Sequence, residues 1–468
     1  MDTKTLTITK CQKGYSEGEF TPSDVVAALS KNINEKNDSL NAYLEVFEDV
    51  NEQIDNLGEQ KGDLWGIPLG IKDNILIKGK TASGGSRILE GYTAPYDATA
   101  IKKLKNKKVL FLGRTNMDEF AMGSSTENSA FGSTKNPIDE SRVPGGSSGG
   151  SAAVVAAGMA IAALGSDTGG SIRQPASLCG LVGFKPTYGA ISRSGLMAMG
   201  SSLDQIGPIT KTVKDTQILF DAMSGNDPLD STTLPDDSFK DERKDAYTIG
   251  VPRDLIEQEG IDDDVLEQFN SSLESLKEKG HTIKEIDLEH ADYALAAYYI
   301  VMPAEVSSNL ARYDGVKFGL HEEGENLLDE YFKTRGVGFG EEVRRRIILG
   351  TYVLSSGYYD AYYNKASALR STIRSEFDVA FKEVDAIATP TTPTPAFKIG
   401  EKIDDPLAMY LEDIFTVPAN IIGVPAISVP SGTAKRDGVV LPLGFQLIAP
   451  HTHESTLFAL GEDIEDGV

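Results

Sequence analysis

Residues Gly145 to Ala176 read GGSSGGSAAVVAAGMAIAALGSDTGGSIRQPA, and this stretch of small residues decides the fold. Two glycine–serine knots, Pro144 to Ser151 and Ser166 to Arg173, enclose the apolar run AAVVAAGMAIAAL at Ala152 to Leu164. A helix with almost no polar face is normally buried on all sides. We therefore expect the apolar run to form a central buried helix, with the two knots as turns at its ends.

Strand and helix patterns alternate on the amino-terminal side of this stretch. Leu64 to Ile75 reads as a short buried strand with a lysine near its end, and Thr21 to Asp24 as the capped start of a helix. Asp97 to Lys107 has the spacing of an amphipathic helix, and Val109 to Gly113 that of a core strand. Such alternation is typical of an α/β protein.

The carboxy-terminal half combines an acidic segment, long helices and a return to strands. Residues 225–265 are acidic and loop-like, which predicts a solvent-exposed loop. Helical patterns fill two long stretches, Asp292 to Asp314 and Glu341 to Val384. Strands are expected again near the end of the chain, at Pro425 to Pro430 and Leu441 to Ala449.

The fold that accounts for these elements most simply is an α/β structure with one large central mixed β-sheet covered by helices on both faces. No repeat of fixed period is visible, so solenoids and propellers are disfavoured. We expect a single domain over residues 1–468. Its core, with the glycine–serine centre, would comprise 60–225 and 400–468, and 225–400 would form a largely helical lobe.

Composition excludes several classes of protein. With 45 Lys and Arg against 70 Asp and Glu, the formal charge is −25, which argues against a nucleic-acid surface on this chain alone. Cys11 and Cys179 cannot build a disulfide framework, and no Cys/His cluster has zinc spacing. No apolar run reaches ~18 residues and the amino terminus lacks a signal core. We expect a soluble cytoplasmic protein without a metal site.

Three interpretations compete for the glycine–serine knots. A phosphate cradle needs GxxxxGK[ST] or GxGxxG, and neither spacing occurs. Simple turn chemistry would explain one knot better than two knots joined by a buried segment. The third interpretation is nucleophilic acyl transfer by Ser171. The consecutive N–H groups of Thr168, Gly169, Gly170 and Ser171 would then converge into an oxyanion hole.

A nucleophilic serine needs a base, and the residues alone leave its identity open. The five histidines all lie more than 100 residues beyond Ser171, in ordinary strand ends, charged runs or a terminal turn. Lys72 follows the apolar GIPLGI, where desolvation would lower its pKa toward neutrality. Without further information, however, a lysine is more often a surface residue than a buried base. Cys179 is expected to be an inert core thiol rather than a rival nucleophile.

These residues also carry a family resemblance. Gly145 to Ala176 matches the amidase signature, and GIPLGIKDN at Gly66 to Asn74 is similar to the lysine motif of the same family. That family uses a Ser–cis-Ser–Lys set and no metal or cofactor of its own. The resemblance implies Ser171 as the acylated nucleophile, Ser147, after a cis peptide, as the bridging serine, and Lys72 as the base.

Further stretches resemble the glutamine-hydrolysing members of the family that serve tRNA-dependent amidotransferases. They are Asp118 to Pro137, Ser307 to Gly319, Glu341 to Tyr363 and Met409 to Pro430. A glutamine site needs a cation for the α-carboxylate and an anion for the α-ammonium group. The resemblance implies Arg346 and Asp413 for these roles, with Arg345 as the neighbouring alternative.

The resemblance also implies partners. Ammonia from glutamine would convert Glu-tRNA(Gln) to Gln-tRNA(Gln), with Asp-tRNA(Asn) as a second option. A B-type subunit would use ATP and Mg and bind the aminoacyl-tRNA, and a small C-type subunit would clamp the heterotrimer. Two alternatives stay open: a stand-alone amidase for another small amide, and a catalytically silent scaffold protein.

Overall fold

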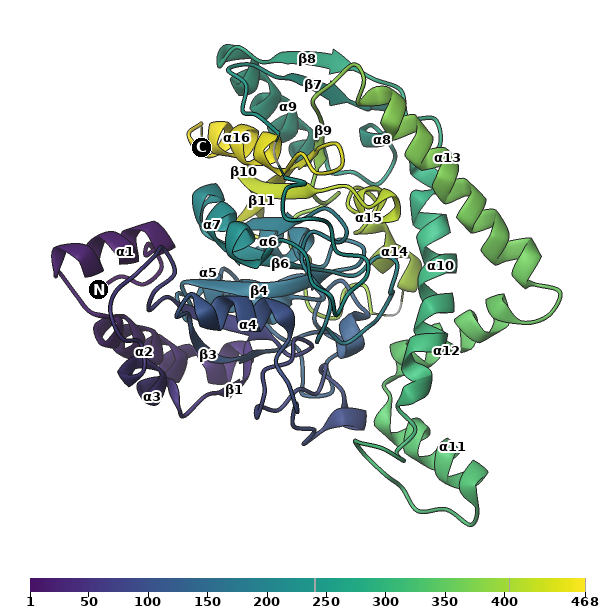
Figure 1. Ribbon diagram of the computed structural model, residues 1–468. Coiled ribbons are helices and arrows are strands. Elements are labelled where there is room, and N and C mark those ends of the chain that lie inside the picture. Colours follow the sequence, from purple (N-terminus) through teal and green to yellow (C-terminus); the bar gives the residue numbers. More distant parts are fainter. Residues whose placement is uncertain (240, 404, 468) are drawn as a thin grey trace.

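One eleven-stranded sheet runs through the computed structural model, which describes residues 1–239, 241–403 and 405–467 (Figure 1). The strand order is β1-β3-β2-β4-β6-β5-β10-β11-β9-β7-β8, with parallel and antiparallel pairs. The predicted large mixed sheet is confirmed. Its strands are β1 (Tyr43–Val46), β2 (Pro68–Lys72), β3 (Leu110–Thr115), β4 (Ala162–Asp167), β5 (Val182–Lys185), β6 (Gln205–Thr210), β7 (Thr248–Val251), β8 (Thr282–Glu285), β9 (Ala386–Pro390), β10 (Ala426–Arg436) and β11 (Val439–Ile448).

Helices cover the sheet and build a layer beside it (Figure 1). The helix expected from Thr21 is present, with Thr21 and Asp24 forming a reciprocal capping box. The helices over the amino-terminal half are α1 (Ile8–Glu17), α2 (Pro22–Leu40), α3 (Val50–Asp55), α4 (Thr99–Asn106), α5 (Gly149–Ala156), α6 (Arg173–Leu178) and α7 (Val213–Met223). The later helices are α8 (Arg253–Ile256), α9 (Asp263–Glu278), α10 (Ala294–Asn309), α11 (Leu327–Gly338), α12 (Glu341–Leu354), α13 (Asn364–Ala380), α14 (Pro406–Leu411), α15 (Val417–Ile422) and α16 (Glu454–Glu465).

The apolar run Ala152 to Leu164 is not one helix, so that prediction is wrong. Helix α5 ends at Ala156, and the run then turns and continues as β4 in the middle of the sheet. The turn needs Gly158, whose φ of 71° lies in the left-handed region that favours glycine. Alanine, valine and isoleucine fill a buried helix and a buried strand equally well, so hydrophobicity alone could not place the boundary.

The position of β4 decides where the chemistry lies. Strands β2 and β4 are parallel neighbours, with Ile71 opposite Leu164. The carboxyl ends of parallel strands meet at one edge of a sheet. Lys72 at the end of β2 is therefore carried to the side of Ser166, where the second glycine–serine knot begins.

The segment 225–400 departs from the prediction in two ways. It supplies β7, β8 and β9 to the same sheet, whereas the sequence predicts a largely helical lobe. The sequence does predict strands at Tyr247 to Pro252 and His281 to Leu288, and these are confirmed as β7 and β8. Its acidic beginning is not a simple solvated loop, because buried Asp227 accepts hydrogen bonds from the hydroxyls of Thr99 and Ser192. The expected helix over Glu341 to Val384 is interrupted after α12, where Gly357 adopts a φ of 88°.

A bilayer-spanning helix is not found in the described part of the chain, because no helix there is long and apolar enough.

Candidate active site

The Lys72 side chain is fully buried at the carboxyl end of β2 and points into a cluster of oxygens. Its Nζ lies 2.8 Å from the Ser147 Oγ and 2.8 Å from the Ser148 Oγ. The Ser166 Oγ and the Ser166 carbonyl oxygen follow at 3.0 and 3.2 Å. The structure thus joins the lysine of one motif to both knots of the other.

Burial lowers the pKa of Lys72 to about 7 from its ordinary value of 10.5. The opposing influence comes from three buried carboxylates, Asp118, Asp167 and Asp204, which favour the charged amine. Desolvation outweighs them because an ammonium without water around it is costly. A large fraction of the amine is therefore unprotonated at neutral pH, as a general base must be.

The two serines of the predicted set lie on adjoining turns. The Gly146–Ser147 peptide is cis, and the Gly146 N–H donates to the Gln174 Oε1 at 2.9 Å. The Ser148 N–H donates to the carbonyl oxygen of Ser171 at 3.2 Å, which ties the turns together. Ser147 is fully buried, whereas Ser171 keeps 8% of its surface exposed. Among the described residues the Ser171 hydroxyl makes no hydrogen bond, so it is free to meet a substrate.

The amides around Ser171 form only part of the expected oxyanion hole. The Gly170 N–H donates to the Asp167 Oδ1 at 2.9 Å and is therefore occupied, contrary to the prediction. No described residue accepts from the N–H groups of Thr168, Gly169 or Ser171, and these remain available. An oxyanion hole needs about two such donors.

A buried ion pair, which the sequence did not reveal, holds the nucleophile turn. The Arg173 Nη2 lies 3.0 Å from the Asp167 Oδ1, and both side chains are fully buried. Burial alone would raise the pKa of Asp167, but the adjacent guanidinium holds it at about 2. Arg173 also donates to the Thr416 carbonyl oxygen and to the side chains of Gln446 and Asn420. Every N–H donor of the Arg173 guanidinium has an acceptor, so these hydrogen bonds hold the nucleophile turn in place.

Arg346 and Arg345, adjacent in sequence, occupy different environments. Arg346 on α12 is 4% exposed, and its Nε donates to the Glu342 Oε1 at 2.7 Å. Its guanidinium lies 5.5 Å from the Tyr299 ring centroid and 5.7 Å from that of Tyr410. The Arg345 side chain is 44% exposed and pairs with Glu341 and Glu342. Burial between aromatic rings thus distinguishes Arg346 from its exposed neighbour Arg345.

The Asp413 carboxylate is buried close to the nucleophile turn. Its Oδ2 accepts the Ser124 hydroxyl at 2.7 Å, and burial raises its pKa to about 7. Arg346 and Asp413 form no hydrogen bond or ion pair with each other among the described residues, so each would reach a ligand separately. Tyr298 packs against the turn itself: a Cβ added to Gly169 would come within 2.8 Å of the Tyr298 ring.

A hollow of ≈ 410 Å³ opens beside Arg346. Its lining includes Arg346 but none of Ser147, Ser171 and Asp413. The remaining lining residues are Gly123, Ser125, Glu127, Asn128, Glu341, Glu342, Arg345, Lys402, Ile403, Met409 and Tyr410.

The rival nucleophile and bases lie elsewhere. Among the described residues no histidine hydrogen-bonds to Ser147 or Ser171; His281 bonds to Asp463 and His290 to Glu376. The Cys179 thiol is buried, which raises its pKa, and it donates to the Pro144 carbonyl oxygen at 3.4 Å. A buried thiol with a raised pKa is a poor nucleophile.

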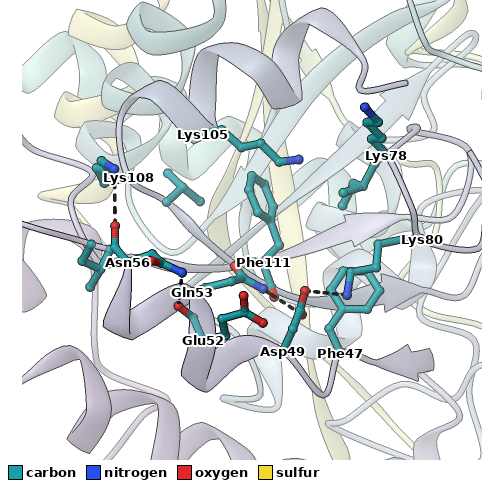
Figure 2. A pocket seen from close by; sticks show the side chains of 13 residues that line it. Phe47, Asp49, Glu52, Gln53, Asn56, Lys78, Lys80, Lys105, Lys108 and Phe111 are labelled. Atoms are coloured by element: carbon teal, nitrogen blue, oxygen red, sulfur yellow. Dashed lines mark hydrogen bonds and ion pairs between the residues drawn. The ribbon is translucent and has the colours of Figure 1, made fainter. Parts of the chain in front are cut away.

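A second hollow, of ≈ 310 Å³, lies between α3 and the end of α4 (Figure 2). Three of its four lysines have partners: Lys80 pairs with Asp49 at 2.7 Å, Lys105 pairs with Asp97 at 2.8 Å, and the Lys108 Nζ donates to the Asn56 carbonyl oxygen at 3.4 Å. Lysines at the end of α4 also compensate the negative end of its dipole. None of the predicted site residues lines this hollow, so it plays no part in the proposed chemistry.

Comparison with known proteins gives a consistent result in sequence and in structure. Residues 24–458 match the family model described as Amidase. The chain is 50% identical over 471 residues to the A-type subunit of glutamyl-tRNA(Gln) amidotransferase from Thermodesulfovibrio yellowstonii, covering 98% of this chain and 96% of the relative. It is 50% identical over 470 residues to the protein of the same name from Thermotoga maritima, covering 99% and 96%.

Solved structures agree with these relatives. A crystal structure of the Thermotoga maritima A-type subunit of glutamyl-tRNA(Gln) amidotransferase superposes with a TM-score of 0.82 at 45% identity, covering 100% of this chain and 95% of that one. A structure described only as an amidase gives a TM-score of 0.83 at 28% identity, covering 99% and 100%. The same fold therefore extends to relatives of lower identity.

Proposed function

The chain belongs to the amidase family, and from this premise we propose that it hydrolyses glutamine as the glutaminase component of a glutamyl-tRNA(Gln) amidotransferase. Relatives at about 50% identity over nearly the whole chain carry that name. The observation that carries the mechanism is the buried Lys72 amine, with a pKa of about 7, lying 2.8 Å from the Ser147 hydroxyl.

The proposed reaction is acyl transfer through a serine ester. Lys72 removes the Ser147 proton while Ser147 takes the proton of Ser171, whose Oγ attacks the side-chain amide carbon of glutamine. The N–H groups of Thr168, Gly169 and Ser171 are available to stabilise the oxyanion. The Lys72 proton then returns through Ser147 to the departing ammonia, and water hydrolyses the γ-glutamyl ester by the same route.

Two charged residues favour glutamine over a simple amide. Arg346 presents its Nη2 to an α-carboxylate, because Glu342 holds its Nε and the Met302 Sδ accepts from its Nη1 at 3.7 Å. Asp413 offers a carboxylate for the α-ammonium group. A stand-alone amidase acting on an apolar amide would have no use for this buried cation and anion.

Arg346→Gln is expected to raise the KM for glutamine roughly a hundredfold, because a charge-assisted contact worth about 2–3 kcal/mol is lost. Hydrolysis of an amide without an α-carboxylate, such as propionamide, should not change. Steady-state ammonia release measures both substrates, and Arg344→Gln, an exposed change on the same helix, is the control. A KM for glutamine within twofold of wild type would contradict glutamine recognition by Arg346.

Glutamine hydrolysis is expected to depend on pH through Lys72. The base works as the neutral amine, and its pKa is about 7, so kcat should rise with pH and level off above neutrality. Below the midpoint kcat should fall about tenfold per pH unit. A pH profile of kcat measures this, and a rate that stays flat well into the acid range would exclude Lys72 as the base.

We propose that the released ammonia is used by partner subunits in the cytoplasm. A B-type subunit would use ATP and Mg and bind aminoacyl-tRNA, and a C-type subunit would clamp the heterotrimer; no cofactor is assigned to this chain. The formal charge of −25 supports this division, because the chain is poorly suited to bind phosphates over a broad surface. The choice between Glu-tRNA(Gln) and Asp-tRNA(Asn) would belong to the B-type subunit.

Co-expression of the tagged chain with the B- and C-type subunits of its own genome tests the assembly. We expect both subunits to co-purify and ammonia release to increase with ATP and aminoacyl-tRNA. Glutaminase activity that is complete without either partner would favour the stand-alone amidase. Co-purification without any glutaminase activity would favour the silent scaffold.

A further inference from the structure

The Ser124 hydroxyl is committed to one oxygen of the Asp413 carboxylate. It donates to the Asp413 Oδ2 at 2.7 Å, and both side chains are buried. Among the described residues, none donates a hydrogen bond to the other carboxylate oxygen, Oδ1. One half of the carboxylate is therefore held by the protein, and the other half is left to accept from a ligand.

Gln174 holds the Ser124 backbone against the turn of the bridging serine. The Gln174 side chain is fully buried, and its Nε2 donates to the Ser124 carbonyl oxygen at 2.8 Å. Its Oε1 accepts the N–H of Gly146, the residue before Ser147. Because both ends of this one amide are used, the position of Ser124 relative to Ser147 is fixed.

The Asp413 backbone is tied to the nucleophile turn through Thr416. The Thr416 Oγ1 donates to the Gly169 carbonyl oxygen at 2.6 Å and lies 3.2 Å from the Asp413 carbonyl oxygen, to which it also donates. Thr416 thus holds the main chain of Asp413, and Ser124 holds its side chain. The place of the carboxylate beside the nucleophile turn is therefore set before a ligand binds.

The charge of Asp413 decides whether it can bind an ammonium group. Burial raises its pKa to about 7, so the carboxyl group is close to half protonated at neutral pH. The ionisable groups that face it are Glu412, Asp167, Arg346, Tyr298 and Tyr299. The two acids raise the pKa further, whereas the guanidinium and the Ser124 hydroxyl lower it. A hydroxyl that donates to a carboxylate favours its charged form.

We infer that Ser124 is a specificity-determining positioning residue, whose hydroxyl keeps the Asp413 carboxylate charged and directs its Oδ1 to the α-ammonium group of glutamine. Ser124 acts through Asp413. This inference rests on the proposed function, and it adds how the site distinguishes glutamine from the same amide without an α-amino group.

The test measures the binding of glutamine and of glutaramate, which is glutamine without the α-amino group, by isothermal titration calorimetry. The protein is the full Ser171→Ala chain with the subunits that co-purify with it, so that neither ligand is consumed. In this background Ser124→Ala removes a hydrogen bond to a charged group. The pH at which half of Asp413 is ionised should therefore rise by about one pH unit.

This rise predicts a loss of affinity that depends on pH and on the ligand. The Kd for glutamine should increase about fivefold at pH 7, where the variant is mostly protonated at Asp413. At about pH 8.5 the carboxylate is charged again, and the Kd should lie within about twofold of the value without Ser124→Ala. The Kd for glutaramate should not change at either pH, because this ligand has no ammonium group.

Ser192→Ala is the matched control. The Ser192 hydroxyl also donates to a buried carboxylate, that of Asp227, at 2.6 Å, and neither residue bonds to a predicted site residue. Both Kd values should stay unchanged in this variant. Ser124→Cys keeps the shape of the side chain but carries a weak donor, so it should also raise the Kd for glutamine at pH 7. It serves as the test if Ser124→Ala does not fold.

An unchanged Kd for glutamine at pH 7 would overturn the inference. An equal rise at both pH values, or an equal rise for glutaramate, would also overturn it, because a general disturbance of the site does not follow the charge of Asp413. If the chain with an intact Ser171 hydrolyses no glutamine and binds both ligands equally, the proposed function fails, and the inference fails with it. The hydrolysis assay therefore distinguishes the two failures.

Discussion

Ser171→Ala is expected to reduce glutamine hydrolysis by roughly 10⁴- to 10⁶-fold, the range found when a serine nucleophile is removed from a hydrolase. The loss should lie in kcat, because Arg346 and Asp413, which are proposed to bind the substrate, are unchanged. Exposure supports this assignment: Ser171 keeps 8% of its surface exposed, whereas Ser147 is fully buried. Ammonia release under saturating glutamine gives kcat, and mass spectrometry of quenched wild-type enzyme should detect the γ-glutamyl ester on Ser171.

Ser177→Ala provides the matched control for this variant. Ser177 lies on α6, which follows the nucleophile turn, and its buried hydroxyl has no hydrogen-bond partner among the described residues. Its removal should therefore cost little stability and no activity. If Ser171→Ala kept more than about one per cent of wild-type turnover, or if the ester formed on another residue, the nucleophile would be misassigned.

The fold could be predicted from the sequence where a segment has one periodicity and clear ends. Helix α4 and strand β3 lie within two residues of the predicted boundaries, because α4 has an amphipathic spacing and β3 is a short continuous apolar run. The prediction fails at the centre for the opposite reason: Ala152 to Leu164 has no polar face to reveal its period. Only Gly158 marks the break, and a glycine inside a small-residue helix is common enough to be overlooked.

The sequence could point to the candidate catalytic residues but not to the residues that hold them in place. Motif resemblance pointed to Lys72, Ser147 and Ser171, and the structure brings the first two within hydrogen-bond distance. The support of the nucleophile turn by Arg173 depends on contacts between segments far apart in the chain. Arg173 bonds to Thr416, Asn420 and Gln446, more than 240 residues away. No local pattern encodes such partners.

Lys72→Met is expected to lower kcat about 10⁴-fold or more, because it removes the base that both serines depend on. The same substitution should keep or raise the thermal unfolding midpoint at neutral pH. The pKa of Lys72 is about 7 in the folded chain, and its ordinary value, which applies to the unfolded chain, is 10.5. Between these two pH values the unfolded chain therefore binds more protons than the folded chain. At pH 7, folding therefore lowers the affinity of the Lys72 amine for its proton, and this costs about 1.4 kcal/mol of stability for each unit by which the pKa is lowered. Methionine binds no proton, so the substitution removes this cost.

Lys185→Met separates the catalytic effect from the effect of burial. Lys185 is as buried as Lys72, its pKa is also lowered to about 7 by desolvation, and its Nζ donates to the Pro186 carbonyl oxygen rather than to a serine. Both variants should weaken the rise of stability between about pH 7 and 10, measured by thermal unfolding at several pH values. Only Lys72→Met should abolish ammonia release. Equal activity losses in the two variants would mean that the loss follows from disturbing a buried amine in general, and the assignment of Lys72 as the base would fall.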